Sequence, residues 1–318
     1  MAHQITDPLI DLATVPPLPL HPAAQAARAP LAGVVADLLA IPDDALERRW
    51  EWRPSEFDEG DVRYGLYRIH EGLEAATGAI ATGHVTDGMS AETAGPAVSA
   101  LRAMGLARWE LHGVLTPLSA ADWDADPGGG EWSVRATLGH IIGGQRSYGW
   151  YNAWYLRQPQ IEGETLYPAD GTMPSDVPEE EEAAGTPTAV MARLDEVVDA
   201  NIAASGHLDV GALRVGARWM GIQVNVGFRL GRYGSHIREH TVQVDKTLAM
   251  IGRQPTEVER VLRLILGSYG RLESLFVGRT ADEMARPFSD GQTPVAILDA
   301  AMADAVATAA EVRAAALG

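Results

Sequence analysis

The 318-residue sequence contains no cysteine, and this absence excludes several classes of protein. It rules out a disulfide framework, a zinc ribbon, an iron–sulfur cluster and a thiol nucleophile belonging to the protein itself. Any metal ion must therefore be held by His, Asp or Glu side chains. A hydrophobic fraction of 46% indicates a globular protein, and the length allows one large domain or two of ordinary size.

Basic residues are scarce: 25 Lys and Arg stand against 43 Asp and Glu, which gives a formal net charge of −18 at pH 7. Nucleic acids and anionic membrane surfaces are recognised mainly by basic faces, so the acid excess argues against both as partners. Long apolar runs are also missing, and the N-terminal sequence lacks the charged and apolar regions of a secretory signal. We therefore expect a cytoplasmic protein that acts on a small molecule.

Helix-start signals recur along the chain and predict an all-α fold. Thr186 precedes Pro187, which places an N-cap hydroxyl before a proline at the first helical position. Thr256 and Glu259 have the spacing of a capping box. Apolar residues recur at helical spacing, and no comparable run alternates as in a strand. The predicted helices lie near 26–40, 62–82, 97–116, 133–157, 187–205, 223–251, 257–277 and 294–316.

Proline and acidic residues interrupt the helical pattern between Arg157 and Thr186. The run Glu179–Glu182 within this break is expected to be solvated surface and not packed helix. The two outer helix pairs are candidates for a second bundle beside the central one. The predicted units are a Pro-rich extension at 1–25, a helix pair at 26–90, a central bundle at 91–252 with an exposed excursion at 158–185, and a helix pair at 253–318.

His236 and His240 stand four positions apart in one predicted helix. Four residues advance about 6 Å and turn about 400°, so both imidazoles project from one face and can bind one ion. His140 is the expected third ligand, because Gly143 and Gly144 follow it and leave room for a second helix or an open coordination position. The other histidines stand where surface or structural histidines are typical: His3, His21, His70, His84, His112 and His207.

Three neutral imidazoles would bind a divalent ion such as Zn²⁺, Ni²⁺ or Fe²⁺ and leave positions for water or substrate. Such an ion lowers the pKa of a bound water or thiol. Arg232, Tyr233, Glu239 and Gln243 stand at helical spacing around the histidine pair. Glu239 is a candidate base, weak ligand or support for a ligand, and Arg232 a candidate receptor for an anionic substrate group. On a helix surface, both are equally typical of a salt bridge.

The segment Trp-Ser-Val-Arg at 132–135, continued by Leu-Gly-His ending at His140, resembles the DinB-like four-helix bundles, as does the later pair His236 and His240. This family includes bacillithiol- and mycothiol-dependent transferases and mycothiol-dependent maleylpyruvate isomerases. The resemblance covers about 97–251 and implies a bundle with a long crossover, a metal ion on the three histidines, and activation of a low-molecular-weight thiol. The chain departs from the pattern in its size and in its Pro- and Glu-rich insertion, which leaves the substrate class open.

Two other interpretations remain at this stage. The segment from His236 to His240 also fits the H-x-x-E-H motif of metallopeptidases, in which Glu239 would be the base and Glu273 a third ligand. A metal- or small-molecule-binding scaffold without catalysis is the other interpretation. The identity of the ion stays open because three imidazoles do not discriminate among later first-row metals, and the chain is expected as a monomer or a homodimer.

Overall fold

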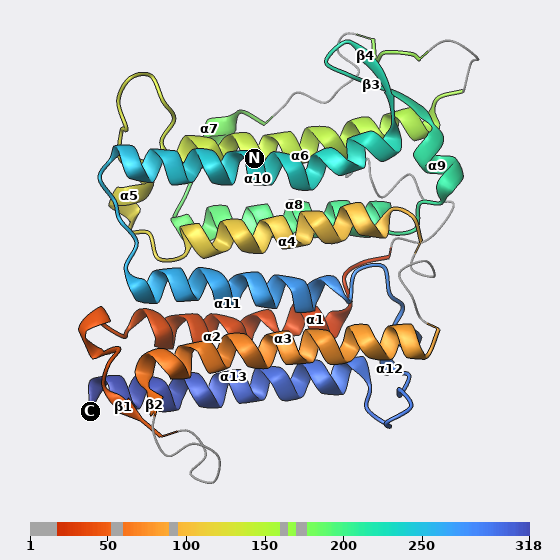
Figure 1. Cartoon of the computed structure of the whole chain (residues 1–318). Helices are drawn as coiled ribbons and strands as arrows, with labels where there is room; N and C mark the ends of the chain where they lie inside the picture. Colours follow the sequence, from red (N-terminus) through yellow and green to blue (C-terminus); the bar gives the residue numbers. More distant parts are fainter. Residues whose placement is uncertain (1–17, 52–59, 89–94, 160–164, 170–176) are drawn as a thin grey trace.

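The computed structural model describes residues 18–51, 60–88, 95–159, 165–169 and 177–318 (Figure 1). Most of the expected Pro-rich extension, including His3, lies outside the described residues, as does part of the excursion at 158–185. The described chain is largely helical with little strand, which confirms the all-α prediction. Among the described helices, none combines the length and the apolar character needed to cross a membrane.

The helices predicted from the sequence are present, and their start points follow from the caps. Ser133 accepts a hydrogen bond from the Ala136 N–H, and both halves of the Thr256–Glu259 capping box form. Long helices in the described residues are α2 (Arg28–Leu39), α3 (Val62–Thr86), α4 (Val98–Leu115), α6 (Val134–Arg157), α8 (Pro187–Ser205), α10 (Val226–Met250), α11 (Glu257–Ser274) and α13 (Pro294–Leu317). Shorter ones are α1 (Pro22–Ala26), η2 (Asp43–Ala45), α5 (Ala120–Asp124), α7 (Glu179–Glu182), α9 (Val210–Arg214) and α12 (Ala281–Ala285).

Two short antiparallel hairpins were not expected. The pairs are β1 (Arg49–Trp50) with β2 (Gly60–Asp61), and β3 (Gly216–Trp219) with β4 (Ile222–Asn225). Their strands are too short for an alternating pattern to be recognised. Met220 and Gly221 turn the second hairpin with φ of 48° and 85°, as a two-residue type I′ turn requires. The helix predicted over 223–251 was therefore wrong at its start, and Asn225 caps α10 by accepting from the Phe228 N–H.

The helix predicted near 62–82 was also wrong at its end. The helix α3 continues past Gly83 to Thr86. The glycine is needed here for close packing, because a Cβ at this position would lie 2.5 Å from atoms of the Phe288 ring. Gly252, by contrast, does follow the end of α10 with a left-handed φ of 76°.

The long helices lie side by side in two groups (Figure 1). In one group, α10 packs against α4 and α6, and α8 packs against α6 and α4. In the other group, α13 packs against α3 and α2, and α11 packs against α3 and α2. The helix α11 also lies along α4 and so connects the groups. The predicted domain boundaries and the second bundle remain predictions.

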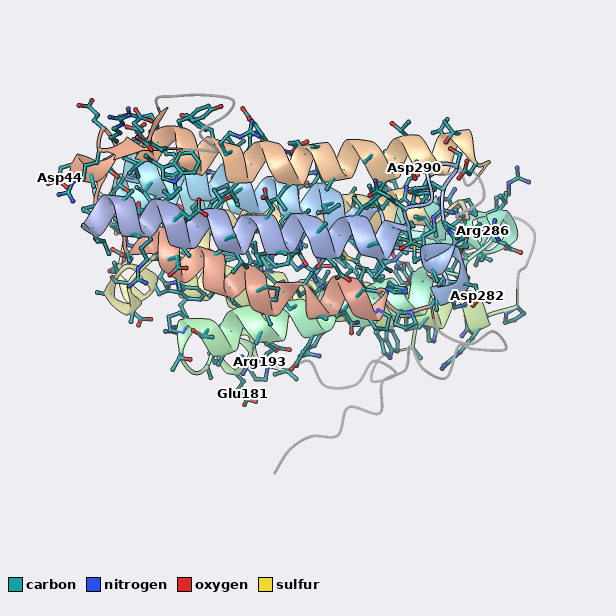
Figure 2. All side chains as sticks on the ribbon, turned by 90° about the horizontal axis from the view of Figure 1, so that it is seen from below. Asp44, Glu181, Arg193, Asp282, Arg286 and Asp290 are labelled. Carbon is teal, nitrogen blue, oxygen red and sulfur yellow. The ribbon has the colours of Figure 1, made fainter. Side chains whose placement is uncertain are left out.

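The expectation for the acidic run was wrong in part, because residues 179–182 form α7 and this helix packs against α6. Glu182 is only 2% exposed, and it accepts a hydrogen bond from Arg146 Nε. Figure 2 shows Glu181 and Arg193 close together on the lower face, where Arg193 donates to main-chain carbonyls of the run. Carboxylates are buried only when they are paired, and the sequence did not reveal these arginine partners.

His84 offers a test of the outer helices that does not involve the predicted metal ligands. It is 4% exposed beside Phe288, and burial together with Arg279 and Arg102 lowers its pKa to about 4. The unfolded chain takes up this proton near pH 6.5, while the folded chain does not, so stability falls as the pH drops from 6.5 toward 4. The loss amounts to about 2 kcal/mol at pH 5.

Between pH 7 and pH 5, the free energy of unfolding of His84→Gln should fall by about 2 kcal/mol less than that of the parent. Urea unfolding at the two pH values measures this difference. His70→Gln is a suitable comparison, because His70 lies on the same helix and is bonded to Ser268. Equal pH dependence in the parent and in His84→Gln would show that His84 is not held neutral in the core.

Candidate metal centre

Three histidine side chains meet where α6 packs against α10. His140 comes from α6, and His236 and His240 come from successive turns of α10. The Nε2 atom of His236 lies 3.3 Å from that of His140 and 3.1 Å from that of His240. The structure thus brings together the three histidines that were predicted as ligands, with ligand atoms all within 4.8 Å of one another.

The spacing of these nitrogens fits a metal ion. Zinc binds imidazole nitrogen at about 2.0–2.1 Å, which separates two ligands of a tetrahedral site by about 3.3 Å. The outer ring nitrogens support the same geometry: Nδ1 of His140 lies 2.8 Å from Glu179 Oε1, and Nδ1 of His240 lies 2.7 Å from Gln243 Oε1. The Glu179 and Gln243 oxygens accept from a protonated Nδ1, so the Nε2 lone pairs of His140 and His240 face the space between the three rings.

Electrostatics keep the two α10 histidines in the neutral form that binds metal. Burial, together with the neighbouring His240 and His140 rings and the Arg232 charge, lowers the pKa of His236 to about 3. Burial also lowers the pKa of His240, against the hydrogen bond with Gln243. Neutral imidazoles at pH 7 need lose no proton before they bind an ion.

Glycines on α6 make the space that the His236 ring occupies. A Cβ added at Gly144 would lie 2.7 Å from Cε1 of His236, which is closer than real side chains approach. A Cβ at Gly143 would meet the Glu179 side chain at an ordinary 3.9 Å. The room expected beside His140 is therefore present, and Gly144 provides it for a ligand.

Aromatic rings surround the histidines. Trp132 lies 4.9 Å from His140 and stacks on His240 at 6.3 Å between ring centroids. Tyr148 meets His236 edge to face at 5.2 Å, and Trp219 in turn lies 5.1 Å from Tyr148. Tyr148 stands two helical turns after His140 on α6, so helical spacing could have revealed it. Nothing in the sequence placed Trp219 here, because it lies on the unexpected β3–β4 hairpin.

Arg232 and Glu239 form an ion pair beside the histidines. The two guanidinium nitrogens donate to the two carboxylate oxygens at 2.7 and 2.8 Å. The hydrogen bonds from Arg232 lower the pKa of Glu239, so this carboxylate is a weaker base than a free one. The Arg232 guanidinium also lies over the Trp219 ring of the β3–β4 hairpin, at 5.2 Å from the ring centroid.

Tyr233 does not face the histidine cluster with its hydroxyl. The side chain is fully buried, and the hydroxyl accepts a hydrogen bond from Asn152 and donates one to Asn201. Burial raises the pKa of Tyr233 to about 12. These contacts describe a core residue that ties α10 to α6 and α8.

Glu273 lies on α11 and is not part of the histidine cluster. Its carboxylate accepts from Trp109 Nε1 at 2.8 Å and from Arg28 Nε at 2.8 Å, and it also bonds with Arg108. These donors belong to α4 and α2, which pack against α11. The H-x-x-E-H interpretation required Glu273 as a third ligand, and the structure places His140 at that position instead.

Comparison with known proteins gives one match. Residues 103–244 match the sequence model of the DinB superfamily, a stretch that begins in α4, ends in α10 and contains all three clustered histidines. No match was found among curated proteins or among solved structures. The helices α2, α3, α11 and α13 lie outside the matched stretch. Residues 103–244 are thus similar to the DinB superfamily, and this similarity supports a DinB-like assignment for that part of the chain.

Proposed function

We propose that this protein is a metal-dependent enzyme of the DinB-like type that uses a divalent ion on His140, His236 and His240 to activate a low-molecular-weight thiol or a water molecule. The convergence of three Nε2 atoms, with separations of 3.1 and 3.3 Å, is the observation that carries the proposal. When bound, the ion supplies a Lewis acid that lowers the pKa of an incoming thiol or water. Zinc, nickel and iron all accept such ligands.

The residues around the histidines have separate roles in this proposal. Glu179 and Gln243 hold the protons on the outer ring nitrogens of His140 and His240, which leaves the Nε2 lone pairs of these two rings for the ion. Trp132 packs against the rings of His140 and His240 and so helps to hold them in place. Because the chain has no cysteine, a thiol must enter as a cosubstrate. We expect S-transfer to a small electrophile, or an isomerisation assisted by the thiol.

Arg232 is the proposed receptor for an anionic group of the substrate. Its guanidinium lies against Trp219, where a flat or apolar substrate part would also find a partner. A substrate carboxylate would displace Glu239, which is 53% exposed and free to swing into solvent. The proposed role of Glu239 is therefore to hold Arg232 in place before the substrate binds.

Metal content tests the proposal directly. We expect about one ion per chain in protein purified without chelator, and loss of that ion in His140→Ala and in His236→Ala, measured by plasma mass spectrometry. His70→Ala is the matched control, because His70 is bonded to Ser268 outside the cluster and should keep the ion.

A metal-dependent reaction between a thiol and an electrophile would then separate an enzyme from a binding scaffold. The parent should turn over such a pair only after metal is supplied, and His140→Ala should not. Absence of metal from the parent after reconstitution with zinc, nickel and iron would contradict the proposal.

A further inference from the structure

The four glutamates of α7 differ in their surroundings, although the sequence Glu179–Glu182 repeats one residue type. Glu180 and Glu181 are exposed. Glu182 is 2% exposed and points into the protein, whereas the Glu179 carboxylate is bonded to the ring of His140. The run therefore contains an anchor at one end and a contact to the histidine cluster at the other.

Arginines fix the anchored end of α7 to the bundle. Arg146 of α6 donates to both oxygens of Glu182 through Nε and a guanidinium NH₂ group. Arg193 of α8 donates to the Glu182 carbonyl, and Arg135 of α6 donates to the Ala183 carbonyl at 2.7 Å. Together these bonds satisfy carbonyls at the C-terminal end of the short helix.

Glycine lets the other end of α7 approach α6 closely. A Cβ added at Gly139 would collide with the main-chain carbonyl of Glu179. Gly139 directly precedes His140, so the main chain of Glu179 sits against the very turn that presents this histidine. The anchor and the close approach together hold the Glu179 Oε1 atom 2.8 Å from Nδ1 of His140.

We infer that Glu179 is a positioning residue of the metal centre, which sets the proton of His140 on Nδ1 and orients the ring so that Nε2 faces the ion. The inference rests on the proposed metal binding. A carboxylate that accepts from the outer nitrogen of a ligand histidine fixes the tautomer and raises the basicity of the ligand. The excursion between α6 and α8 therefore supplies a residue of the site, Glu179, which lies 39 positions after His140 in the sequence.

Zinc affinity provides the first measurement, by competition with a chromogenic chelator. We expect Glu179→Ala to weaken zinc binding about tenfold, and Glu179→Gln to weaken it less because the amide oxygen still accepts from Nδ1. Glu180→Ala is the matched control from the same run and should bind zinc as the parent does. Glu179 is about half exposed, so these variants should keep the folded structure.

The position of the ring proton provides the second measurement and needs no metal. Nitrogen NMR of the metal-free protein should place the His140 proton on Nδ1 in the parent and in Glu180→Ala, and distribute it over both nitrogens in Glu179→Ala. Unchanged zinc affinity and an unchanged proton position in Glu179→Ala would overturn the inference. The proposed function would still stand in that case if the parent binds one zinc ion per chain. Equal weakening by Glu179→Ala and Glu180→Ala would also overturn the inference, because the effect would then be one of general charge.

Discussion

Gly144→Ala is expected to weaken zinc binding about a hundredfold without unfolding the protein. The added methyl group would lie 2.7 Å from Cε1 of His236, so the ring must move away from its place beside His140 and His240. Overpacking of this kind costs about 1–3 kcal/mol, and each 1.4 kcal/mol is a factor of about ten in affinity. The loss should fall mainly on metal binding, because the displaced group is one of the three ligands.

Gly143→Ala is the matched control on the neighbouring position. Its methyl group would meet only the Glu179 side chain, at 3.9 Å, and should leave zinc affinity unchanged. Both substitutions replace glycine inside α6, where alanine favours the helix by about 0.5–1 kcal/mol, so a general effect on helix stability cancels between them. Zinc competition and thermal unfolding are the measurements. Equal affinity in the two variants would mean that the ion does not depend on the position of His236.

Local signals explain why the long helices could be predicted. Thr186, Ser133 and Thr256 cap helices through hydrogen bonds to main-chain N–H groups within three residues, so the sequence alone contains both partners. The glycine at position 83 is explained by Phe288, about two hundred positions away in the sequence, whose ring leaves no room for a Cβ there. No local pattern distinguishes such a packing glycine from one that ends a helix.

The three histidines were found because helical geometry relates sequence spacing to position in space. His236 and His240 share a face at a spacing of four, and small residues after His140 indicated room beside it. The supporting residues obey no such relation: Glu179 comes from the excursion and Trp219 from a hairpin. The acidic run was interpreted as solvated surface since a sequence does not reveal which arginines will reach a carboxylate.

Arg108→Met is expected to lower the free energy of unfolding by about 3–5 kcal/mol. Arg108 is fully buried on α4 and bonds with Asp199 of α8 and Glu273 of α11. Removal of this cation leaves the buried Glu273 and the half-buried Asp199 with fewer partners, which costs more than the loss of an exposed pair. Burial opposes the ionisation of Asp195 nearby, yet His112 and Arg108 outweigh it and lower its pKa to about 2.

Urea unfolding of matched variants separates this effect from the loss of a surface ion pair. Arg238→Met breaks the exposed pair with Glu110, whose atoms lie 2.9 Å apart, and should cost less than about 1 kcal/mol. The double variant of Arg108→Met with Glu273→Gln should recover part of the loss, because the second substitution removes one of the negative charges that Arg108 no longer balances. Arg108 lies in the stretch that matches the DinB superfamily and bonds with α11, which lies outside that stretch. Loss of Arg108 should therefore destabilise both groups of packed helices together. A cost below about 1 kcal/mol for Arg108→Met would mean that apolar packing between α4 and α11 holds the two groups without these charges.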